Sequence, residues 1–216
     1  MRHRFALLAG FAGACLGTSQ PASAQGTIAY YRPETPIPMF TRGFPEQYAL
    51  DMDGDASTDF TFTYSFSFLG VRSESANRIL ILLSPPPNVG GPVVPLSAGF
   101  SIASDSGSSG LAWSARSSLD PFETLSQCFD SGCGGAFVGQ HAYMGVEFER
   151  SGSTYYGWVL LNVAPDYPAG TIEAWAWETR PGEPILAGAV PEPSTRALLA
   201  KGGFLFCWYG RKKRMA

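Results

Sequence analysis

The sequence predicts an all-β protein, in which one antiparallel β-sandwich or jelly-roll-like domain lies between an N-terminal helix and a short C-terminal helix. The chain of 216 residues holds 25 Gly and 17 Pro, and this composition suits short strands and many turns better than long helices. The central region has no run of apolar residues at helical spacing, whereas residues 59–68 alternate with a period of two. We therefore expect a single domain over residues 25–180.

Residues 1–24 are predicted to be a secretory signal peptide, which accounts for the N-terminal helix. Residues 2–4 are basic, residues 5–16 are mostly apolar, and Ala22 and Ala24 provide the small side chains of a cleavage site. We expect the chain to be exported and the signal peptide to be cleaved after Ala24. The alternatives are a helix buried in the fold and a lipid-attached N-terminus.

The clearest strand is the segment DFTFTYSFSF, residues 59–68. Its aromatic residues share one parity, namely Phe60, Phe62, Tyr64, Phe66 and Phe68. Its hydroxyl residues share the other, namely Thr61, Thr63, Ser65 and Ser67. Successive side chains of a strand point to opposite faces, so the pattern predicts a half-buried strand whose aromatic rings enter the core.

Further strands are predicted between stretches rich in Gly, Pro and Ser. They cover residues 27–31, 78–83, 99–103, 136–139, 142–148, 154–163 and 171–178. A hairpin is expected around Ser151 and Gly152, because Ser-Gly is a turn pair. Residues 171–178 carry apolar side chains at both parities, so this strand is expected to be buried on both faces.

Oxygen-bearing side chains alternate along the acidic segment before the aromatic strand. They are Asp51, Asp53, Asp55, Ser57 and Asp59. Ca²⁺ takes six to eight oxygen ligands, so the spacing predicts a structural calcium site. The segment departs from an EF-hand, because Ala56 and Phe62 replace the glycine and the glutamate of that motif. The alternative is a plain Asp/Gly turn that caps the strand.

Cys128 and Cys133 are the two cysteines of the central region. In an exported protein they are expected to form a disulfide that closes a small surface loop. The alternative is a pair of free thiols.

The sequence contains no recognisable catalytic motif, and we expect no enzymatic activity. His141 is the one histidine left after removal of the signal peptide, and no G-x-S-x-G elbow occurs. A glycosidase would require a carboxylate pair, for which the candidates are Glu147, Glu149, Glu173 and Glu178. A carbohydrate-binding module would require exposed aromatic platforms, for which the candidates are Trp113, Trp158, Trp175 and Trp177.

Charge is unevenly distributed along the chain. Residues 25–190 hold 17 acidic and 7 basic side chains, whereas residues 191–216 hold six basic side chains and one acidic one. The acidic body should repel nucleic acid. Four prolines lie within residues 179–195, and residues 181–189 are expected to be an extended linker.

The end of the chain, residues 190–216, resembles the sorting signal of PEP-CTERM proteins, a group of exported bacterial proteins. The resemblance rests on the motif Val190, Pro191, Glu192, Pro193 and Ser194, on an apolar run over residues 197–210, and on the basic cluster Arg211, Lys212, Lys213 and Arg214. One departure is the length of the run: it has 14 residues and contains Lys201, whereas a membrane span needs about 20.

This resemblance implies recognition by an exosortase, a membrane protease or transpeptidase that processes the chain near the Pro-Glu-Pro motif. It implies a Gram-negative bacterium that makes exopolysaccharide, with the C-terminal segment held in the membrane before processing. We therefore expect a non-enzymatic protein of the cell surface or extracellular matrix. The alternatives are a carbohydrate-binding module and, less favoured, a secreted hydrolase.

Overall fold

The computed structural model of this chain describes residues 28–39, 46–83, 91–108, 110–114 and 122–191. Within these ranges it contains fourteen strands, one short 3-10 helix (η1, Ser104–Gly107) and no α-helix. The prediction of an all-β fold with antiparallel sheets is therefore confirmed. The predicted signal helix and C-terminal helix lie outside the described residues.

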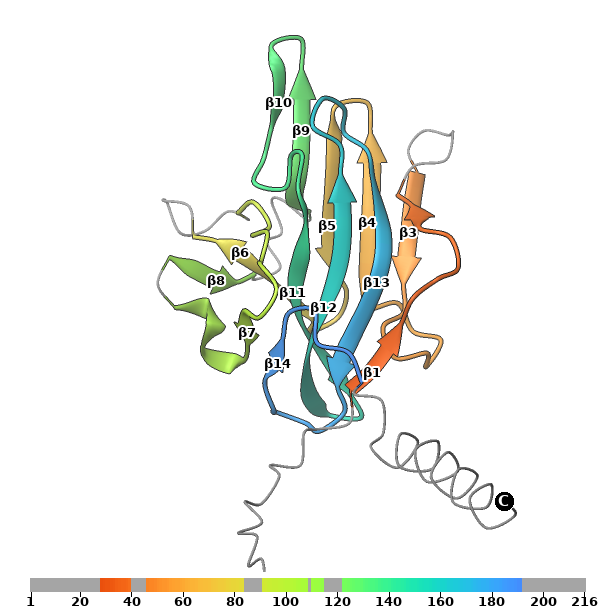
Figure 1. Cartoon of the computed structure of the whole chain (residues 1–216), viewed down its shortest axis with the longest axis vertical. Coiled ribbons are helices and arrows are strands. Elements are labelled where there is room, and N and C mark those ends of the chain that lie inside the picture. Colours follow the sequence, from red (N-terminus) through yellow and green to blue (C-terminus); the bar gives the residue numbers. More distant parts are fainter. Residues whose placement is uncertain (1–27, 40–45, 84–90, 109, 115–121, 192–216) are drawn as a thin grey trace, which may run out of the picture.

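Two antiparallel sheets make up most of the described structure (Figure 1). The larger has the order β1 (Ile28–Tyr31), β13 (Gly170–Glu178), β12 (Ser153–Val163), β11 (His141–Arg150), β6 (Arg78–Leu82) and β8 (Leu111–Trp113), and β2 (Ile37–Pro38) pairs with β13. The smaller has the order β10 (Gly132–Gly134), β9 (Glu123–Phe129), β5 (Phe68–Ser73), β4 (Phe60–Ser65) and β3 (Glu46–Leu50). A separate ribbon pairs β7 (Ser101–Ile102) with β14 (Ile185–Leu186).

The main core lies between the two sheets. Phe60, Phe62 and Tyr64 of β4 are buried in it, as the alternation predicts. From the larger sheet, Phe148 and Trp175 enter the same cluster. Burial of apolar surface is the dominant favourable contribution to folding, and each of these rings adds a large apolar area to it.

The aromatic strand differs from its prediction in two respects. It ends at Ser65, and Phe66 and Ser67 form a turn that leads into β5, so residues 59–68 span a hairpin. Its hydroxyl face is buried as well as its aromatic face, since Thr61 and Thr63 are both buried. The Thr61 hydroxyl donates a hydrogen bond to a Glu74 carboxylate oxygen at 2.7 Å.

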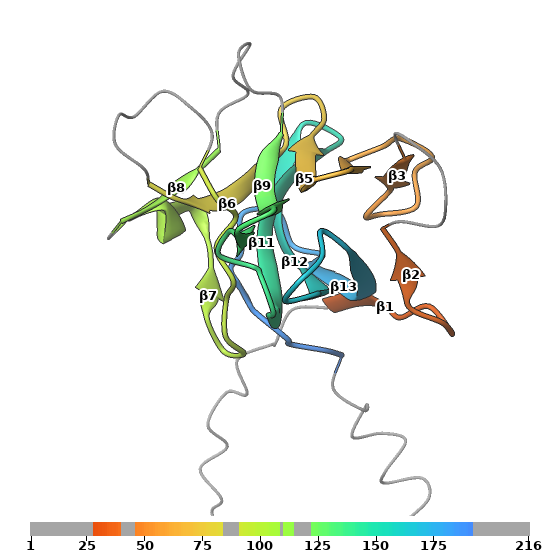
Figure 2. The ribbon, with the colours of Figure 1, turned by 90° about the horizontal axis from the view of Figure 1, so that it is seen from above.

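A second core covers the opposite face of the larger sheet, so that β12 and β13 are buried on both faces. Trp175 and Trp177 belong to the main core, whereas Ala174 and Ala176 belong to the second core together with Trp158. Figure 2 shows β3 and β5 on one side of β12 and β13 and β7 on the other. The prediction of two-sided burial for residues 171–178 is confirmed.

Residues 181–189 are not the extended linker that their proline content led us to expect. They contain β14, and Ile185 and Ala187 are buried in the second core. The Ala187 amide donates to the Phe100 carbonyl at 2.8 Å, and the Trp158 indole donates to the Ala189 carbonyl at 3.2 Å. The body therefore continues to within two residues of Pro191.

Of the remaining predictions, the hairpin around Ser151 and Gly152 is confirmed, and the strand at residues 136–139 is wrong. Strands β11 and β12 meet with Arg150 paired to Ser153, and Ser151 and Gly152 take positive φ angles of 52° and 75°, as two-residue hairpin turns require. Residues 136–139 form a turn and not a strand. Their apolar character serves a different purpose, because Phe137 enters the main core from that turn.

Candidate functional site

The acidic segment forms the loop between β3 and β4. Carboxylate oxygens of Asp51, Asp53 and Asp59 all lie within 4.8 Å of one another. Asp55, which the spacing placed in the same site, is exposed and does not belong to this carboxylate cluster, and Ser57 is also exposed. Three of the five predicted ligands are therefore brought together.

Backbone amides of the loop bind the carboxylates. Asp51 accepts hydrogen bonds from the Gly54 and Ala56 amides, each at 2.8 Å, and Asp55 accepts one from the Ser57 amide at 2.7 Å. Gly54 and Ala56 have φ angles of 77° and 71°, a conformation that turns their amides toward Asp51. The Asp55 contact, two residues along the chain, is that of an Asx turn, whereas the Asp51 carboxylate reaches amides three and five residues along.

Asp59 fixes the buried end of the loop. Its carboxylate accepts hydrogen bonds from the Met52 amide at 2.8 Å and from the Asn77 side chain at 2.9 Å. Burial raises the pKa of Asp59 to about 6, although these two bonds act in the opposite direction. Asn77 also accepts a hydrogen bond from the Glu149 amide at 2.9 Å, so it connects the loop to β11.

Asp53 lies beside a cation from a distant part of the chain. Its carboxylate is 2.9 Å from the Arg150 guanidinium. Burial raises the pKa of Asp53, and Arg150 opposes that effect. Arg150 and Asn77 were not foreseen, because nothing local in the sequence links β11 or the start of β6 to this loop.

The cluster has the chemistry of a calcium site. The carboxylates supply hard oxygen ligands, and the 4.8 Å spread suits one ion with ligand distances of 2.3–2.6 Å. The turn alternative also accounts for the hydrogen bonds of the loop. Binding of Ca²⁺ here stays a prediction.

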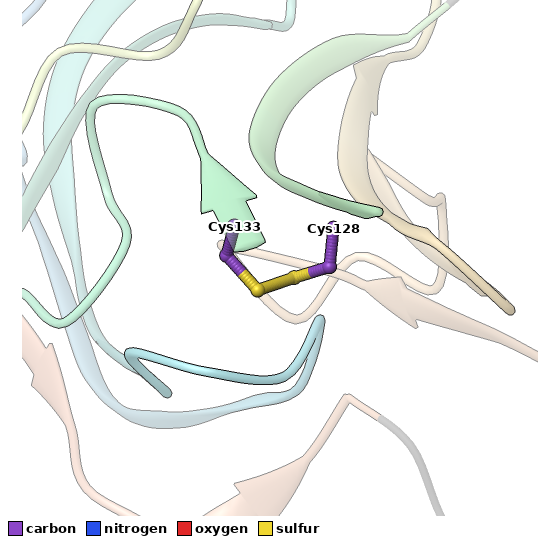
Figure 3. Close-up of a disulfide and its surroundings, with 2 residues drawn as sticks. All are labelled: Cys128 and Cys133. Atoms are coloured by element: carbon purple, nitrogen blue, oxygen red, sulfur yellow. A yellow bond between two sulfur atoms is a disulfide. The ribbon is translucent and has the colours of Figure 1, made fainter. Parts of the chain in front are cut away.

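Cys128 and Cys133 form a disulfide between β9 and β10 (Figure 3), where they are directly paired across the hairpin. Next to it, a groove of about 580 Å³ is lined by residues of three turns. They are Phe66, Ser67, Cys128, Phe129, Asp130, Ser131, Asp166, Tyr167 and Pro168. We call this surface the tip groove. Sequence reasoning missed it, because the three turns lie far apart along the chain.

Three of the four tryptophans considered as aromatic platforms, Trp158, Trp175 and Trp177, are core residues. Trp158 is buried in the second core, so its ring is not available at the surface. Trp175 and Trp177 line a groove of about 290 Å³ beside the acidic loop, yet their exposed fractions are only 7% and 9%. The Trp175 indole donates to the Met52 carbonyl at 3.2 Å, which ties the loop to the core. Trp113 is half-buried.

Three of the four candidate catalytic glutamates lie against a basic side chain. Glu147 pairs with Arg78, Glu173 with His141 at 3.0 Å, and Glu178 with Arg180 at 3.1 Å. Glu149, the fourth, is exposed at the end of β11. His141 is thus a surface residue of the sheet with a carboxylate neighbour.

Of the predicted sorting residues, Val190 and Pro191 are described, and both are exposed. Glu192, Pro193, Ser194 and the basic cluster at residues 211–214 lie outside the described residues. In the part of the chain that is described, no helix has the length and apolar character to cross a membrane.

Comparison with known proteins identifies no relative. No family model matches the chain, and no curated protein or solved structure shows significant similarity to it. The function is therefore inferred from the residues of this chain alone.

Proposed function

We propose that this chain is a non-enzymatic exported protein of the cell surface or extracellular matrix of a Gram-negative bacterium. In this proposal its tail, residues 190–216, is recognised by an exosortase-type membrane protein, and the mature body is associated with exopolysaccharide. The C-terminal segment holds the chain in the membrane until processing. The acidic body binds no nucleic acid, because like charges repel.

The observation that carries the proposal is where the folded body ends. The hydrogen bond from the Trp158 indole fixes the Ala189 carbonyl, and the next residue, Val190, is already 49% exposed. The motif thus begins directly after Ala189, the residue that this hydrogen bond holds. Pro191 has no amide proton and cannot join a sheet through that position, which favours an extended and accessible peptide for an enzyme to bind.

Other features of the body agree with export. The disulfide between Cys128 and Cys133 belongs to oxidising compartments. The two facing sheets favour the sandwich form of the predicted fold, within a single domain that extends to residue 189.

A carbohydrate-binding module is the second candidate, and the tip groove favours it. Its exposed aromatic residues replace the buried tryptophans that the sequence suggested. The hydrolase is less favoured, because three candidate glutamates are already paired with basic side chains.

Mass spectrometry of the protein from exosortase-containing cells tests the sorting proposal. We expect loss of the residues after the Pro-Glu-Pro motif in the native protein and an intact C-terminus in the variant Glu192→Ala. The control is Glu183→Gln, which removes an exposed glutamate outside the motif and should be processed normally. An intact C-terminus in the native protein, in cells with active exosortase, would rule out the proposal.

A further inference from the structure

The tip groove lies at one end of the molecule. Its residues come from the turns between β4 and β5, between β9 and β10, and between β12 and β13. All three turns are at the top of Figure 1, whereas β14, after which the described chain ends, is near the bottom. The groove and β14 are therefore at opposite ends of the body.

Three aromatic rings are exposed in this groove. The exposed fractions are 77% for Phe66, 63% for Phe129 and 43% for Tyr167. Leaving such rings in water forgoes the gain of burying them, and contiguous exposed apolar side chains commonly mark a binding surface.

Two contacts hold parts of the groove in place. The disulfide joins β9 to β10 on either side of the turn that carries Asp130. Tyr167 lies within hydrogen-bond distance of Tyr64, with 2.8 Å between the two hydroxyl oxygens. The β9–β10 turn and the Tyr167 side chain are therefore held before binding, and groups held in this way lose little conformational freedom on contact with a ligand.

The polar residues of the groove restrict the ligand. Asp130 and Asp166 line it, together with Ser67 and Ser131, and none of the described residues that line it is basic. An anionic ligand would be repelled by these carboxylates and by the acidic body. A second copy of the chain would place four aspartates in one interface, which opposes self-association through this surface.

We propose that the tip groove binds a polysaccharide without negative charge, either neutral or carrying free amino groups. The faces of sugar rings stack on Phe66, Phe129 and Tyr167. The carboxylates of Asp130 and Asp166 accept hydrogen bonds from hydroxyl or ammonium groups, which are strong when one partner is ionised. The inference rests on the proposed function and gives its exopolysaccharide association a location on the body.

Affinity gel electrophoresis of the full chain tests this inference. The gels contain hydroxyethyl cellulose, a β-1,3-glucan, galactomannan, glycol chitosan or, as the anionic member, alginate. We expect at least one of the first four to retard the protein and alginate not to do so. The double variant Phe66→Ala/Phe129→Ala should bind at least tenfold more weakly, with an unchanged melting temperature, because both side chains are exposed.

The matched control is Leu186→Ala, which removes an exposed apolar side chain at the opposite end of the body. It should bind as the native protein does, and Phe129→Trp should keep or improve binding. Retardation by none of the four polysaccharides overturns the inference, as does equal retardation of the double variant. Preference for alginate, or for phosphatidylglycerol vesicles, contradicts the charge argument.

Analytical sedimentation of the same proteins tests the remaining possibility, that a second copy of the chain occupies the groove. A dimer that is lost in the double variant would identify the groove as a self-association surface and overturn the inference. The sorting proposal fails separately: mass spectrometry reports on the C-terminus whether or not a polysaccharide is bound, and binding is measured whether or not the tail is removed.

Discussion

Asn77 is the residue that connects the acidic loop to the larger sheet. Its side chain donates to Asp59 and accepts from the Glu149 amide, and removal of one partner leaves buried polar groups unsatisfied. We expect Asn77→Ala to lower the free energy of unfolding by about 2 kcal/mol in urea denaturation. Asn162→Ala, at an exposed position of β12, is the control and should change it by less than about 0.5 kcal/mol. Equal effects would contradict the bridging role.

The calcium prediction is tested at Asp51 and Asp53. A bound ion stabilises the folded state, by about 2.7 kcal/mol at a concentration 100 times the dissociation constant. We therefore expect Ca²⁺ to raise the melting temperature, a chelator to lower it, and Asp51→Asn/Asp53→Asn to abolish both effects. If calorimetry shows no heat of calcium binding, and a chelator does not change the melting temperature, the loop is a turn and not a calcium site.

Sequence reasoning located part of this site. The alternating series over residues 51–59 predicted a cluster that contains Asp51, Asp53 and Asp59, but it also included Asp55, which the turn of the loop leaves outside. It could not place Arg150 or Asn77, which reach the loop only through the pairing of β11 with β6. The sequence left open whether the tryptophans are platforms or core residues for a similar reason: the two cores that bury Trp158, Trp175 and Trp177 are formed by distant strands, which no local pattern reveals.

At the scale of elements, β14 is the clearest correction to the sequence analysis. Ile185 is buried in the second core, whereas its neighbour Leu186 is 50% exposed. We expect Ile185→Ala to cost about 2–5 kcal/mol of stability, as large-to-small changes in cores do, and Leu186→Ala to cost less than about 0.5 kcal/mol. Denaturation in urea measures both. A free linker would give two neutral substitutions.

The disulfide has a local role in the β9–β10 hairpin. Its two cysteines are separated by only five positions, and a loop this short removes little entropy from the unfolded chain, worth about 2 kcal/mol at most. We expect Cys128→Ser/Cys133→Ser to lower stability by no more than this and to increase hydrogen exchange in β9 and β10. A loss well above that value would show that the hairpin supports the whole fold.

The strands were predicted best where alternation coincides with burial, as in β4 and β13. The alternation of aromatic and hydroxyl residues continues through the turn at Phe66 and Ser67, so it could not mark the end of β4. Strands β3 and β9 were missed, because polar residues such as Gln47 and Gln127 interrupt any apolar pattern. Their place in the smaller sheet is decided by pairing with β4 and β5, which are distant contacts for β9.

For the whole molecule, the larger sheet is shared by the two cores. Trp175 reports on the main core and Trp158 on the second, and both belong to neighbouring strands. We expect the body to unfold in one cooperative step, since neither core can be lost without disrupting the sheet between them. Tryptophan fluorescence and far-ultraviolet circular dichroism should give the same urea midpoint. Separate midpoints would mean that the second core opens on its own.

The position of β14 near the end of the described chain affects when the second core can be completed. Ile185 and Ala187 complete the second core over Trp158 and Ala176, and they come after every other buried member of that core along the chain. If the chain is exported from its N-terminus, as we propose, one face of β12 and β13 would stay open to water until these residues emerge. Under that proposal, completion of folding would coincide with the arrival of residues 190–194 at the membrane surface, and a cut soon afterwards would release a body that has just finished folding.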